Sequence, residues 1–262
     1  MDWLGNLIKA TAWEMEKPPS YGTFHLTFTL VGFAICVFLA WWLRNLGEKG
    51  TRRLLFGIGV FLIVTEVYKQ LFYYYHIGGG SYQWWIFPFQ LCSIPMYFCT
   101  VAPLLRRGRV RHAMLCFMTT FNLVGGLISF AEPSGLMHEY WTLTLHALLW
   151  HMCLVFVGFF LIASGRGARS MRDYRLSVLM FLSLSVIAFC INLLLADVSG
   201  NTVNMFYVGP RNSPLAVFKQ IAEAAGWYVC TLLYLPALCI GAFLVFLPRY
   251  LWERRAARRN KS

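Results

Sequence analysis

The stretch Trp84-Trp85-Ile86-Phe87-Pro88-Phe89-Gln90-Leu91-Cys92-Ser93-Ile94-Pro95 opens an apolar run that continues to Leu105 and is long enough to cross a bilayer. It nevertheless carries two prolines, an amide, a thiol and a hydroxyl near its start. Each proline removes a backbone donor and bends a helix, and in hydrocarbon the freed carbonyl groups need partners. The sequence therefore predicts a kinked helix at the centre of a bundle, with a polar patch below one membrane surface.

The composition of the whole chain is that of a polytopic membrane protein. Of its 262 residues, 58% are hydrophobic and only 13% are charged, whereas about a quarter of a soluble domain is charged. A hydrocarbon core about 30 Å thick needs roughly 20 apolar residues per helix. We expect an all-α fold with seven transmembrane helices, at residues 22–43, 54–75, 84–105, 113–131, 141–163, 174–196 and 225–247.

The spans divide the chain into three parts. We expect residues 1–21 to form an amphipathic segment on the membrane interface, 22–247 to form the seven-helix domain, and 248–262 to form a basic cytoplasmic tail. No cleavable signal peptide is evident at the N-terminus. The eight cysteines all fall within predicted helices, so we expect no disulfide framework.

The net charge of +12 is distributed along the chain in an alternating pattern. Lys and Arg gather in the first, third and fifth loops and in the tail, whereas the second and fourth loops contain none. This positive-inside pattern places the N-terminus outside and the C-terminus in the cytoplasm of a multi-pass protein, which we expect in a bacterial inner membrane. The basic loops and tail are expected to meet anionic headgroups, and topology explains their charge without a nucleic-acid partner.

Polar side chains concentrate in the predicted outer or middle parts of the helices, and the cytoplasmic halves are almost purely apolar. Polar groups at this depth are costly, so they should face one another or a wet cavity. We expect one polar cavity that opens outward or laterally into the outer leaflet, capped by residues 197–224. The polar residues are His25, Glu66, Lys69, Gln70, Gln90, Cys92, Ser93, Asn122, His146, His151, Asn192 and Tyr228.

A nucleophile–base pair could be assembled in this cavity. Cys92 or Ser93 would be the nucleophile and His151 the base, an arrangement suited to acyl transfer or ester cleavage on a lipid. Spacing alone also leaves structural roles open. These are a small buried side chain for Cys92, a bond to its own helix for Ser93, and a core or interhelical hydrogen bond for His151.

Other polar residues would support the chemistry. Glu66 or Asn192 could orient the imidazole, and Gln90 or Asn122 could stabilise an oxyanion. No HxxxH or HExxH spacing lies on one helix, so we expect neither a metal nor another cofactor. The residues expected to bind the substrate are Gln90, Glu66, Asn122, Asn192, Asn204 and Tyr228.

Four short motifs carry a family resemblance. Phe87-Pro88-Phe89-Gln90-Leu91-Cys92 resembles the Leu-Pro-Leu-His-Leu-Cys signature of the YwaF family of bacterial integral membrane proteins. The other three are Trp150-His151-Met152, which resembles the family's Ser-His-Gly; Asn204-Met205-Phe206-Tyr207-Val208, which resembles Asn-Tyr-Met-Phe-Leu; and Gly226-Trp227-Tyr228, which resembles Pro-Trp-Tyr. Their order and spacing agree from about residue 20 to residue 247.

The resemblance implies a polytopic helical protein. The distant animal relatives of the YwaF family include an acyltransferase that remodels ether phospholipids through a cysteine. More distantly, they include a Thr–His family that hydrolyses fatty-acid esters. This favours lipid acyl chemistry and carries over His151 as the base. Gln90 replaces the signature His, and Phe89 stands where the animal enzymes have their cysteine, so their mechanism does not transfer to Cys92.

Our leading hypothesis is an intramembrane acyl-transfer or ester-hydrolysing enzyme that acts on an outer-leaflet lipid. The alternative is a non-enzymatic accessory, binding or transport subunit for a lipid, small molecule or partner membrane protein, motivated by the loss of the signature His at Gln90. Helix count and topology also suggest a heptahelical sensor. No lysine lies in the middle of the last span, which excludes a rhodopsin.

Overall fold

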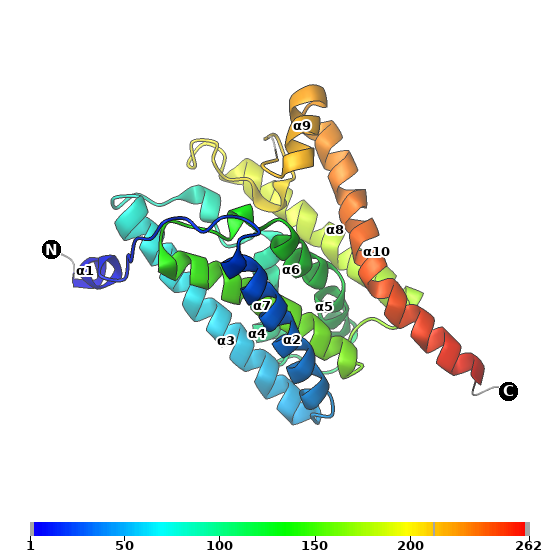
Figure 1. The fold of residues 1–262 in the computed structure, drawn as a ribbon. Helices are drawn as coiled ribbons and strands as arrows, with labels where there is room; N and C mark the ends of the chain where they lie inside the picture. Colours follow the sequence, from blue (N-terminus) through cyan, green and yellow to red (C-terminus); the bar gives the residue numbers. More distant parts are fainter. Residues whose placement is uncertain (1–2, 212, 260–262) are drawn as a thin grey trace.

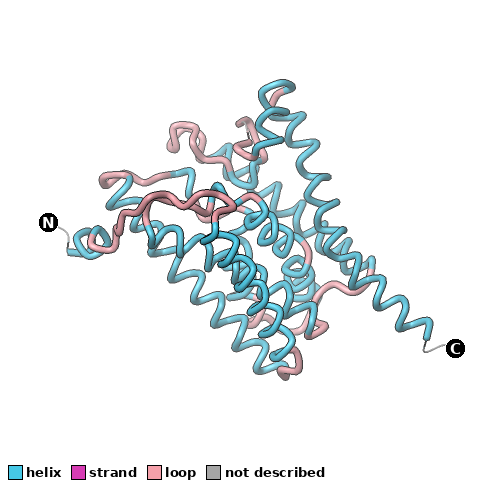
Figure 2. Tube along the Cα trace, in the orientation of Figure 1, coloured by secondary structure: helices cyan, strands magenta, loops and turns pink. Residues whose placement is uncertain are grey.

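The computed structural model describes residues 3–211 and 213–259, and the regular elements in these ranges are helices (Figure 1, Figure 2). Their only extended pairing is an isolated bridge between Glu14 and Tyr140. The predicted all-α fold class is confirmed. Six helical spans of the described chain are long and apolar enough to cross a membrane. They are α2 (Thr23–Leu43), α3 (Glu48–Phe72) with the π-helical η1 (Tyr73–Ile77), α5 (Arg109–Thr119) with α6 (Phe121–Ala131), α7 (Trp141–Ala163), α8 (Met171–Leu194) and α10 (Trp227–Arg259).

The remaining elements are shorter. They are α1 (Trp3–Lys9), η2 (Trp84–Ile86), η3 (Leu91–Ser93), α4 (Ile94–Val101), η4 (Pro133–Gly135), η5 (Met205–Tyr207) and α9 (Ala216–Ala225). Of the predicted tail, residues up to Arg259 continue α10, and 260–262 lie outside the described residues.

Residues 84–105 were predicted to form one kinked helix, but they form two short 3-10 turns and the short helix α4 instead. Proline disfavours helical backbone in the residue before it, and Phe87 accordingly has a ψ of 132°. Gln90 is also extended, with a ψ of 162°. An α-helix forms only at α4, where Pro95 sits in the first turn and its missing donor is tolerated. Eight helical residues cover about 12 Å, so irregular backbone completes this passage through the bundle.

Helix α7 lies at the centre of the bundle and contacts α2, α3, α5 and α6. Its residues Leu148, Leu154, Val155 and Phe160 are fully buried. Helices α8 and α10 flank the opposite side from α2 and α3 (Figure 1). Many apolar side chains of α2 and α10 are exposed instead, as expected of helices that face lipid.

Two glycines set how closely the helices approach. A Cβ on Gly59 of α3 would lie 2.7 Å from the backbone nitrogen of Thr100, so only glycine lets α4 pack this near. A Cβ on Gly126 of α6 would lie 3.0 Å from Val155 Cγ2. The close approach of α6 to α7 therefore depends on Gly126 and not on its neighbour Gly125, where a Cβ would meet open space.

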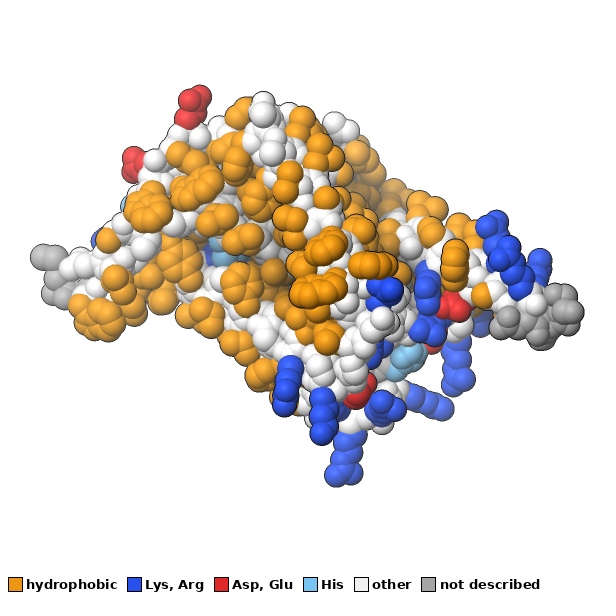
Figure 3. All heavy atoms as spheres, turned by 60° about the horizontal axis from the view of Figure 1, so that its bottom comes forward, with side chains coloured by type: hydrophobic (Ala, Val, Ile, Leu, Met, Phe, Trp, Pro, Cys, Tyr) orange, Lys and Arg blue, Asp and Glu red, His pale blue; other side chains and the backbone are white. Residues whose placement is uncertain are grey.

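The basic loops and the C-terminal helix meet at one end of the bundle, which we call the basic end. Arg166 Nη2 donates to the carbonyl oxygen of Leu46, and Arg169 Nε lies 3.7 Å from Glu253 Oε1. Arg52 donates to the carbonyl oxygen of Leu105. Lys and Arg side chains gather on this side of the molecule while apolar side chains cover much of the rest (Figure 3).

Candidate functional site

A cavity of about 220 Å³ lies toward the other end, which we call the pocket end. Five of the residues expected from the sequence line it: Glu66, Gln90, Cys92, Ser93 and His151. They come from α3, from the irregular segment before α4, and from α7. These five polar residues therefore line one cavity, and the roles assigned to them stay predictions.

Glu66 is the charged centre of this cavity and is only 4% exposed. Its Oε1 lies 2.9 Å from Lys69 Nζ and accepts a 2.6 Å hydrogen bond from Gln70 Nε2. The three residues share one helix face, as their spacing predicts. Glu66 Oε2 has no hydrogen-bond partner among the described residues, so this oxygen remains available to a ligand or to water.

His151 is held in one orientation by its own helix. Its Nδ1 lies 2.8 Å from the carbonyl oxygen of Ala147, which can only accept, so Nδ1 carries the proton. The neutral ring then has a lone pair on Nε2, the form that a general base requires. Trp150, which precedes His151 in the chain, donates from Nε1 to the carbonyl oxygen of Cys92 at 2.9 Å and holds the segment around Cys92 against α7.

Two side-chain amides hold the segment 204–208 over the cavity. Gln90 Nε2 donates to the carbonyl oxygen of Asn204, and Gln90 Oε1 accepts from the Phe206 backbone N–H, both at 2.9 Å. Asn192 Oδ1 accepts from the Met205 N–H at 2.6 Å, and its Nδ2 donates to the carbonyl oxygens of Met205 and Val208. Tyr207 of this segment lines the cavity, which agrees with the expected cap from loop 197–224.

The other predicted site residues do not line the cavity. Asn122 is buried and donates to the carbonyl oxygens of Met118 and Leu154, which ties α6 to α7. Asn204 contributes its backbone carbonyl to the contact with Gln90. Tyr228 is 58% exposed and packs against Trp227 at the start of α10.

The cavity also contains Lys69 and His146, which were expected to share a polar cavity but were given no catalytic or binding role, and Tyr207 and His138, which were not expected there. Lys69 lies on the same face of α3 as Glu66, and His146 lines the same cavity as His151 although their five-residue spacing predicts different faces of α7. Tyr207 comes from the cap, where burial raises its pKa to about 12. His138 comes from a loop, and burial, then Lys17 and Lys69, lower its pKa. Sequence patterns give no signal for a loop histidine.

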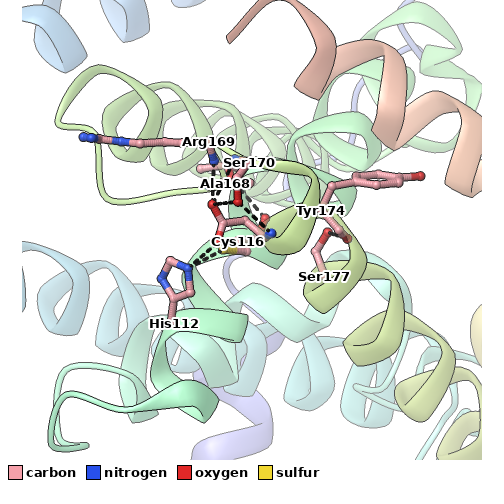
Figure 4. Close-up of polar contacts among 9 residues, drawn as sticks. His112, Cys116, Ala168, Arg169, Ser170, Tyr174 and Ser177 are labelled. Atoms are coloured by element: carbon pink, nitrogen blue, oxygen red, sulfur yellow. Dashed lines mark hydrogen bonds and ion pairs between the residues drawn. The ribbon is translucent and has the colours of Figure 1, made fainter. Parts of the chain in front are cut away.

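A second polar cluster lies at the basic end (Figure 4). His112 Nε2 lies 2.7 Å from Asp173 Oδ1 and 3.5 Å from Cys116 Sγ, so these three side chains could hold a metal ion. The other oxygen of Asp173 accepts from the backbone N–H groups of Arg169 and Ser170 and caps α8. His112 and Cys116 are four residues apart on α5. The HxxxH and HExxH patterns require two histidines, so they do not detect this pair.

Comparison with known proteins identifies one family. No curated protein and no solved structure matches the chain. Residues 20–247, which include the first five candidate spans and most of α10, match the TMEM164 family. Because the match covers most of the chain, this membrane protein belongs to the TMEM164 family.

Proposed function

We propose that the protein transfers or hydrolyses an acyl ester of a membrane lipid in the cavity at the pocket end. The observation that carries this proposal is the convergence of His151, Cys92 and Ser93 on one cavity inside an apolar bundle. Such a site admits the ester of an amphiphile while the exposed apolar helices keep the rest of the chain in the bilayer. The YwaF-type resemblance at Phe87–Cys92 and His151 supports lipid acyl chemistry in a multi-pass protein of a bacterial cell membrane.

The reaction follows from the tautomer of His151. Nε2 accepts the proton of Cys92 Sγ or Ser93 Oγ as the sulfur or oxygen attacks the ester carbonyl carbon. The bond to the lipid alkoxide then breaks, and the imidazolium returns the proton to that leaving oxygen. A second alcohol for transfer, or water for hydrolysis, then attacks the acyl carbon and gives its proton to His151 Nε2. The acyl–enzyme bond breaks, and the imidazolium returns that proton to the released Cys92 Sγ or Ser93 Oγ. Glu66 balances the imidazolium charge, and the Lys69 ammonium stabilises the oxyanion.

This assignment uses Lys69 where the amides Gln90 and Asn122 were expected. Both amide nitrogens already donate to backbone carbonyls, Gln90 to Asn204 and Asn122 to Met118 and Leu154. A hydrogen bond to a developing oxyanion would require them to release those partners, which costs about 1–3 kcal/mol for each buried group left unsatisfied.

The test is turnover of outer-leaflet phospholipids in membranes that carry His151→Ala. We expect acyl exchange or release to fall at least 10²-fold, as for loss of a general base, with an unchanged melting temperature. His76→Ala is the control, because His76 packs on Phe72 and Tyr140 outside the cavity. Full turnover in His151→Ala rejects the mechanism. Cys92→Ala and Ser93→Ala then identify the nucleophile.

Gln90 favours a second candidate function, a non-enzymatic binding or accessory subunit. The side chain at the signature His position binds backbone on both of its polar atoms and cannot act as a base. Comparison of membrane lipid profiles with and without the protein separates the two. An unchanged profile together with a stoichiometric co-purifying membrane protein supports the accessory role.

A further inference from the structure

A second cavity, of about 380 Å³, lies at the basic end, remote in the fold from the proposed lipid site. It is bordered by the start of α3, the start of α5 and the turn that leads into α8. Four arginines and two carboxylates line it. They are Arg107, Arg111, Arg166, Arg169, Glu48 and Asp173.

The two carboxylates leave the cavity positively charged because they are already engaged. Glu48 Oε1 lies 2.5 Å from Arg111 Nη2, and Oε2 lies 3.5 Å from Arg107 Nη2. Asp173 accepts from the backbone at the start of α8 and contacts His112. Arg166 therefore has no carboxylate within ion-pair distance among the described residues, and Arg169 shares Glu253, at 3.7 Å, with Arg249.

Arg111 is the buried member of the set, with a side chain only 7% exposed. Its Nε has no hydrogen-bond partner among the described residues. A buried guanidinium donor without an acceptor is costly, and an anion in the cavity would satisfy it. Because this cavity lies among the loops at the end of the spans, it stands at the depth of lipid headgroups.

We propose that this cavity binds a phosphate group. Planar guanidinium forks match the oxygens of phosphate, and the negative charge of such a group balances the surplus guanidinium charge of the cavity. The phosphate could belong to an anionic lipid headgroup or be free in solution, since both present the same oxygens. The proposal is independent of the acyl chemistry at the pocket end.

A zinc ion on His112, Cys116 and Asp173 fits less well. In a tetrahedral site with bonds of about 2.0 Å, nitrogen and oxygen ligands stand about 3.3 Å apart. His112 Nε2 and Asp173 Oδ1 are 2.7 Å apart, a hydrogen-bond distance that joins α5 to α8. Figure 4 shows that the Arg169 side chain extends away from this cluster. Arg169 lines the cavity instead. Four nearby guanidinium groups also repel a dication.

The experiment measures binding to the full-length protein in detergent by native mass spectrometry. The probes are phosphatidylglycerol, phosphatidylcholine, inorganic phosphate and Zn²⁺. We expect phosphatidylglycerol to bind in preference to phosphatidylcholine, and Arg166→Gln to weaken it about tenfold. Arg107→Gln should weaken it in the same direction, and Arg107 is 79% exposed, so its loss should not impair folding. Arg258→Gln in the exposed last turns of α10 is the matched control.

The outcomes separate the two sources of phosphate. Displacement of phosphatidylglycerol by inorganic phosphate supports a site that binds the lipid headgroup through its phosphate group. Binding of inorganic phosphate alone, lost in both arginine variants, supports a site for the free ion. Equal binding by the parent, Arg107→Gln and Arg166→Gln overturns the proposal. It is also overturned if one Zn²⁺ binds, is lost in His112→Ala, and no phosphate compound binds.

Discussion

At Phe206 and Tyr207 the backbone takes φ angles of 54° and 53°, a region that L residues rarely adopt. Such conformations cost of order 1–3 kcal/mol each and persist only where the surroundings impose them. Gln90 and Asn192 supply that constraint through hydrogen bonds on both sides of the strained pair. The strained backbone places Tyr207 in the cavity. Gln90 and Asn192 therefore influence the site by fixing the backbone of this segment.

Replacing Gln90 by Leu should therefore release this segment. The change removes two hydrogen bonds and leaves the Phe206 N–H and the Asn204 carbonyl without their partner, which should destabilise the fold by about 1–3 kcal/mol. Hydrogen exchange at the Phe206 amide should accelerate. Gln83→Leu is the matched control, because within the described chain that amide donates only one solvent-exposed hydrogen bond, to the nearby Ser81 carbonyl. Equal protection in both variants would contradict the role of Gln90.

Residue positions were easier to predict than residue partners. The cost of polar groups in hydrocarbon predicted that Glu66, Gln90 and His151 would meet, and they line one cavity. The same argument placed Asn122 there, but its amide bridges α6 and α7. Both outcomes satisfy a buried amide, and the choice depends on which carbonyl groups lie within reach across helices, which spacing along one chain does not encode.

Among the elements, α4 owes its position to a neighbour as much as to its own sequence. It is too short to cross a bilayer alone, and it packs along α3. Hydropathy and segment length predicted the six long spans, because length and apolar content suffice for them. They did not predict the irregular backbone from Phe87 to Gln90, since hydropathy registers apolar residues whether or not they are helical.

Gly59→Ala should break the contact between α3 and α4. The added methyl group would lie 2.4 Å from Thr100 Oγ1 and 2.7 Å from the Thr100 backbone nitrogen. Helix α4 would have to move, and overpacking of this kind costs about 1–3 kcal/mol. Thermal unfolding in detergent measures the loss. Gly57→Ala on the same helix meets no atom within 4 Å, so it should leave the melting temperature unchanged or raise it. Similar losses in both variants would show that helix propensity, not packing, is responsible.

For the whole molecule, the distribution of charge gives the chain a direction across the membrane. Contacts among Arg52, Leu105, Arg166 and Leu46 gather the basic loops at one end, and the third segment reaches that end even though α4 is short. The passage across the bundle is therefore preserved, and the two ends of the described chain lie toward opposite ends of the bundle (Figure 1). Which end faces the cytoplasm is a prediction from the positive-inside rule.

Labelling with a membrane-impermeant maleimide tests that orientation. Ser81 is exposed in the loop after η1 at the pocket end, and Gly47 is exposed in the turn between α2 and α3 at the basic end, with open space for a side chain. Loops rich in Lys and Arg are retained in the cytoplasm, so the pocket end should face outward. In intact cells, Ser81→Cys should therefore be labelled more strongly than the parent protein, whose own cysteines give the baseline labelling. Gly47→Cys should react only after permeabilisation. The reverse pattern would place the proposed lipid site on the cytoplasmic side and the arginine cavity outside, and would remove the outer leaflet as the source of substrate.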